Sequence, residues 1–122
     1  MKKLLMAIIL FTGLFLMFSC EYEYIQPDIP LIPDEVSFSE DIVPIFTKSC
    51  NAAVCHDVGG APPDLTPQNA YLSLTNGGYL NLETPNQSSL YVSLKTGSMK
   101  GYAQPGDAEF ILAWITQGAK NN

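Results

Sequence analysis

Cys50, Cys55 and His56 lie close together in the chain, and this histidine is the only one among the 122 residues. The four residues between the cysteines, Asn51 to Val54, carry no charge. Thiols and imidazole are the side chains that form disulfides, bond covalently to cofactors and bind transition metals. In a chain this short, a disulfide, cofactor or metal bound by this segment would constrain the whole fold.

The pattern Cys-x4-Cys-His predicts covalent attachment of one haem c. The sulfurs of Cys50 and Cys55 would add to the haem vinyl groups, and His56 would bind the iron. The usual pattern has two residues between the cysteines, and this chain carries the rarer spacing of four.

Two alternatives to haem attachment remain open. Neighbouring cysteines in an oxidising compartment also form structural disulfides. A zinc site would need a fourth ligand, for which the sequence offers no second cluster.

The N-terminus has the organisation of a secretory signal. Lys2 and Lys3 precede an apolar run from Leu4 to Phe18, which is too short for a confident membrane span. The run ends at Ser19 and Cys20, which resemble a relaxed bacterial lipobox. We therefore predict a signal peptide over 1–19 and acyl chains on Cys20, with an unmodified Cys20 as the alternative. This predicts an extracytoplasmic protein anchored by lipid to a bacterial membrane, most simply the outer membrane.

Residues 20–35 are rich in proline and acidic side chains, a composition that does not pack or continue a helix. We interpret them as a flexible tether. The signal segment holds two of the six basic residues and none of the twelve acidic ones, so the remaining chain is more acidic than the formal net charge of −6. This acidity argues against binding of nucleic acid and favours redox protein partners with a basic docking face.

Residues 36–122 predict a small all-α domain of about four short helices. Ser37 and Glu40 form a candidate capping box ahead of a first helix that leads into Cys50, with Ser39 and Asp41 as alternative caps. Further helices are expected after Thr66–Pro67, over about 88–95, and from Gly106 to a C-terminal cap at Gly118. Asn76–Gly77 could also make a tight turn with a minor hairpin.

This order of elements resembles the class I cytochrome c fold. Several segments are similar to bacterial monohaem c-type cytochrome lipoproteins, namely 36–46, the Cys50–His56 segment, 61–66, 69–71 and 111–121. The resemblance implies a cytochrome c domain over 36–122, folded around one covalent haem, that carries single electrons and has no substrate chemistry of its own. The alternatives are a haem sensor or peroxidase-like protein with an open sixth site, and a non-haem binding lipoprotein with a structural disulfide.

If a haem is bound, the sixth ligand follows by elimination. Three of the four methionines lie in the signal segment, no second histidine exists, and Met99 alone remains. Water, Lys95 or Lys100 are the alternatives. The family usually has proline after its ligand methionine, and this chain has Lys100.

The resemblance also implies that the Pro63 carbonyl accepts a hydrogen bond from His56, with Pro62 as a substitute, and that Leu65 packs against the haem. We assign Tyr71, Tyr79, Tyr102 and Trp114 to the core or to the cofactor wall rather than to catalysis.

Overall fold

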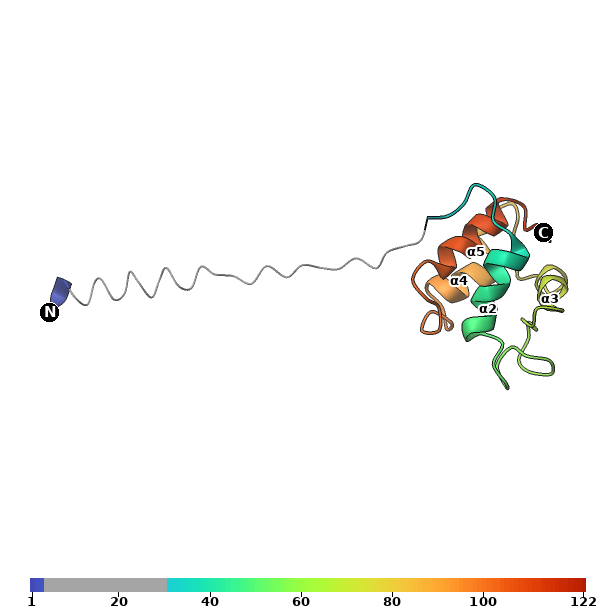
Figure 1. Ribbon diagram of the computed structural model, residues 1–122, viewed down its shortest axis with the longest axis horizontal. Helices are drawn as coiled ribbons and strands as arrows, with labels where there is room; N and C mark the ends of the chain where they lie inside the picture. The colour runs from blue at the N-terminus through green and yellow to red at the C-terminus, as the bar shows by residue number, and fades with distance from the viewer. Residues whose placement is uncertain (4–30) are drawn as a thin grey trace.

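The computed structural model describes residues 1–3 and 31–122 of the chain (Figure 1). The predicted signal segment beyond residue 3, the predicted lipidation site Cys20 and the tether up to residue 30 lie outside the described residues. Those assignments therefore stay predictions. Among the described residues, none of the helices is both long enough and apolar enough to cross a membrane.

The domain is all-α, as the sequence predicted. A π-helical turn, η1 (Phe38–Ile42), continues into α2 (Val43–Ser49). Then follow α3 (Ala70–Asn76), a short 3-10 turn η2 (Pro85–Gln87), α4 (Ser89–Lys95) and α5 (Asp107–Thr116). Helices α4 and α5 pack against each other, and α5 also contacts η1 (Figure 1). The first and last helical segments of the domain therefore meet in space.

The predicted minor hairpin after Gly77 is wrong, because the described part of the chain contains no β-strand. The Tyr79 carbonyl instead accepts the Leu90 N–H at 3.2 Å, and the Asn81 N–H donates to Ser88 Oγ at 2.8 Å. The polar backbone groups of this segment are thus satisfied by the start of α4, and no second strand is required.

The cap of the first helix differs from the predicted box in one partner. Ser37 Oγ accepts the Glu40 N–H at 3.2 Å, as expected for a cap. The reciprocal bond comes from Asp41, whose Oδ2 accepts the Ser37 N–H at 2.8 Å. Pro44 has no N–H to donate, and the α-helical pattern begins only at Val43, after the π-helical turn. In this cap it is Asp41, and not Glu40 as predicted, whose carboxylate accepts the Ser37 N–H.

Helix α3 begins at Ala70, later than the Thr66–Pro67 pair predicted. Thr66 closes a turn around Asp64 instead, because its N–H and its hydroxyl both donate to Asp64 Oδ1, at 2.9 and 2.6 Å. The Asp64 carboxylate accepts these bonds in its charged form, and they lower its pKa. This turn fixes the end of the loop that carries the histidine.

The core is centred on Trp114, which is fully buried in α5. Its ring centroid lies 5.1 Å from that of Phe38, and Phe38 meets Tyr71 edge-on at 5.3 Å. The Trp114 Nε1–H donates to the Lys120 carbonyl at 2.8 Å, so the indole has no unsatisfied polar atom. Tyr102, in contrast, is 60% exposed, and its assignment to the core or wall is wrong.

Candidate functional site

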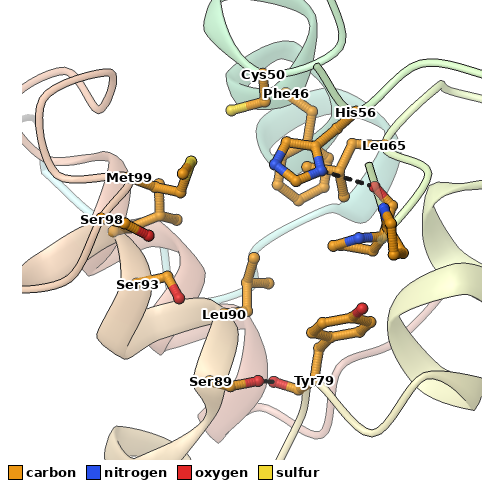
Figure 2. A pocket seen from close by; sticks show the side chains of 13 residues that line it. Phe46, Cys50, His56, Leu65, Tyr79, Ser89, Leu90, Ser93, Ser98 and Met99 are labelled. Atoms are coloured by element: carbon orange, nitrogen blue, oxygen red, sulfur yellow. Dashed lines mark hydrogen bonds between the residues drawn. The ribbon is translucent and has the colours of Figure 1, made fainter. Parts of the chain in front are cut away.

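A cavity of about 260 Å³ opens between the end of α2, the loop that follows it, and α4 (Figure 2). Five of the predicted site residues line it: Cys50, His56, Pro63, Leu65 and Met99. The remaining wall is formed by Phe46, Pro62, Tyr79, Ser89, Leu90, Ser93, Leu94 and Ser98. The fold thus brings together side chains from three separate parts of the sequence.

His56 is held by two backbone carbonyls. Its Nδ1 lies 2.8 Å from the Ala61 oxygen and 3.0 Å from the Pro63 oxygen. A carbonyl can only accept, so Nδ1 carries the proton and donates. In the neutral imidazole the other ring nitrogen, Nε2, carries the lone pair, and Figure 2 shows it on the side of the ring away from the Pro63 carbonyl, facing the cavity. This is the arrangement that a metal-ligating imidazole requires.

The predicted hydrogen bond from His56 to Pro63 is confirmed, and Pro62 is not the acceptor. The bond to Ala61 was not predicted from the sequence. Since any residue has a carbonyl, its side chain gives no signal that its backbone will turn toward a histidine.

The loop that carries His56 is closed by its own backbone hydrogen bonds. The His56 N–H donates to the Cys50 carbonyl at 3.1 Å, and the Leu65 N–H donates to the His56 carbonyl at 2.8 Å. Gly60 passes so close to this turn that a Cβ atom there would lie 2.4 Å from the Cys55 oxygen. A glycine is needed at this position because the backbone itself is the neighbour, and it allows Ala61 to reach the histidine.

The two thiols are placed differently. Cys50 is half-buried and lines the cavity, whereas Cys55 is exposed and does not. Both are free cysteines, so the structural disulfide weighed from the sequence does not form between them in this structure. The spacer between them bulges outward, with Val54 89% exposed and in the left-handed region at a φ of 66°. The fold therefore does not bring Cys55 to the cavity as the sequence predicted.

The environment of Cys50 suppresses its ionisation. Burial, then the nearby Asp107 carboxylate, then Cys55 raise the pKa of the Cys50 thiol from 9.0 to about 11. Because the thiolate is the reactive form, Cys50 should react slowly at moderate pH. In the protein without cofactor, we expect iodoacetamide at pH 8 to modify Cys55 well before Cys50, as measured by peptide mass spectrometry.

The raised pKa also gives the folded protein a pH dependence. Between pH 9 and 11 the unfolded chain loses the Cys50 proton while the folded protein keeps it, so stability falls as the pH rises through this window. A Cys50→Ala variant should show a smaller fall in its urea midpoint over the same range. Equal falls in both proteins would contradict this assignment.

Met99 lines the cavity from the side that faces His56, on the loop that follows α4 (Figure 2). It is half-buried and packs against the core. The alternative ligands do not line this cavity. Lys95 is paired with Glu109, and both Lys95 and Lys100 border a second cavity of about 330 Å³. Of the candidates for a ligand opposite His56, Met99 is the one that the fold places there.

The cavity wall combines apolar and hydroxyl groups and has no lysine or arginine. Leu90 and Leu94 alternate with Ser89 and Ser93 on one face of α4. The two serines were not predicted as site residues, although a spacing of four residues on a helix places them on one face. The described residues contain no group of three His, Cys, Asp or Glu side chains placed to hold a metal ion together.

Searches of protein-family models, curated proteins and solved structures found no match to this chain.

Proposed function

We propose that this protein is a membrane-tethered monohaem cytochrome c that carries single electrons. The observation that carries the proposal is the arrangement of His56. Its Nδ1 is fixed by two carbonyls, and its free nitrogen faces a cavity that also contains Cys50 and, on the facing wall, Met99.

The residues of the cavity fit a haem. Phe46, Leu65 and Leu90 provide apolar wall for a flat macrocycle, while His56 and Met99 are the candidate iron ligands. A bound haem would supply a one-electron redox centre, and a thioether opposite an imidazole favours its reduced state. Attachment through both thiols requires the exposed Asn51–Val54 segment to carry Cys55 toward the cavity mouth.

Electron transfer is favoured over substrate chemistry because two protein ligands would fill both axial positions. If Met99 binds the iron as well as His56, no position would be left open for peroxide or a diatomic gas. The predicted lipid on Cys20 would keep the carrier at an extracytoplasmic membrane surface, most simply the outer membrane. There it would exchange electrons with redox partners that present a basic docking face.

The test is to express the full chain in a bacterium that has a cytochrome c maturation system, and to measure its mass under denaturing conditions. We expect the mass of one haem to remain on the chain, and a low-spin spectrum after reduction. A C50A/C55A variant should lose the covalent haem. A wild-type mass without haem would overturn the proposal, and a high-spin ferrous spectrum would favour a sensor or peroxidase-like protein.

A further inference from the structure

We propose that Gly97 is the positioning residue that holds Met99 opposite His56. It would do so by allowing the loop after α4 to lie directly on the backbone of that helix. This inference rests on the proposed function, and it adds a residue that does not itself line the cavity.

The first observation is the attachment of the Met99 backbone to α4. The Met99 N–H donates to the Ser93 carbonyl at 3.1 Å, and the Gly97 N–H donates to the Val92 carbonyl at 2.9 Å. These two bonds fold the chain back over the last turn of α4. The position of the Met99 backbone is therefore fixed relative to the last turn of α4.

The second observation is the space at Gly97. A Cβ atom there would lie 2.8 Å from the Ser93 Cα and 3.2 Å from both the Ser93 and Val92 oxygens. All three atoms belong to the backbone, which cannot move aside as a flexible side chain can. Any other residue at position 97 must push the loop away from α4, and the Ser93 carbonyl is the same atom that accepts the Met99 N–H.

Moving the loop away from α4 should change the position of the Met99 side chain more than it changes the stability of the fold. Ser98 and Lys100, on either side of Met99, are exposed, and Met99 packs against the core without being one of its buried residues. A metal–thioether bond tolerates only a small range of distances, and misplacement of a ligand by about 1 Å is sufficient to disable a site. Loss of ligation without unfolding is the expected consequence.

Gly101 provides a matched control in the same loop. A Cβ atom at Gly101 would have no heavy atom within 4 Å, and Gly101 is not among the glycines with positive φ. Gly97→Ala and Gly101→Ala therefore make the same chemical change two positions from Met99, on opposite sides of it, and differ in the backbone contact.

The experiment compares wild type, G97A and G101A as full-length, haem-loaded proteins. For G97A we expect loss of most of the absorption from the thioether bond to ferric iron, a lower midpoint potential, and a gain of carbon monoxide binding in the ferrous form. Covalent haem content should stay at the wild-type level. G101A should match wild type in all four measurements.

An unchanged spectrum and potential in G97A would overturn the positioning role. So would equal changes in G97A and G101A, or a G97A protein that fails to fold or to retain haem, because Gly97 would then act on the whole domain. Failure of the proposed function itself is seen separately, as absence of haem from the wild-type protein.

Discussion

Replacing Trp114 with alanine is expected to lower the free energy of unfolding by about 3–5 kcal/mol, the usual cost of truncating a large buried aromatic side chain. Trp114 is fully buried, and its ring lies against Phe38 with centroids 5.1 Å apart. The substitution also leaves the Lys120 carbonyl without the indole N–H that it accepts at 2.8 Å. Urea denaturation followed by circular dichroism measures the change.

Tyr102→Ala is the control for this measurement. Tyr102 is another large aromatic residue, but it is 60% exposed, so its truncation should change stability by no more than about 0.5 kcal/mol. Comparable losses in the two variants would show that Trp114 is not the centre of the core.

Replacing His56 with alanine is expected to abolish the haem protein, whereas replacing Met99 with alanine should preserve it in an altered form. His56 is the residue whose ring is fixed by the Ala61 and Pro63 carbonyls. Met99 is on the facing wall and takes no part in those bonds. M99A should therefore keep covalent haem, have a lower midpoint potential, and bind carbon monoxide when reduced.

The measurements are haem content of the purified chain, midpoint potential and the spectrum with carbon monoxide. Equal haem content in H56A and wild type would contradict the assignment of His56 as the ligand. A wild-type potential in M99A would show that the sixth ligand lies elsewhere, and the Lys100→Ala variant would then be the next to examine.

Much of the helical fold could be predicted from local signals. The apolar run around Trp114, bounded by Gly106 and Gly118, gave α5 nearly to the residue, because turn-forming glycines mark both ends: their φ values are 94° and 96°. The predicted start of α3 and the partner in the Ser37 cap were wrong for a common reason. In both places a nearby carboxylate forms a local hydrogen bond that the sequence spacing did not reveal: Asp41 accepts the Ser37 N–H expected to go to Glu40, and Asp64 accepts the Thr66 hydroxyl expected to cap α3.

The prediction of a minor hairpin was wrong because a turn sequence makes a hairpin only when two strands pair on either side of it. Here the Tyr79 carbonyl bonds to the Leu90 N–H of α4 instead. Cys55 is the corresponding error in the candidate site. The sequence places it next to His56, but the four-residue spacer turns outward at Val54 and leaves the Cys55 side chain exposed.

The sequence by itself determined which side chains are available: one histidine, two cysteines beside it, and one methionine outside the predicted signal segment. Chemistry of this kind is a property of residue identity and needs no fold. Only the tertiary structure decided that Met99 faces His56, that Ala61 joins Pro63 in holding the ring, and that Gly97 lies against the backbone of α4. These are contacts between segments far apart in the chain or between backbone atoms common to every residue, so no local pattern encodes them.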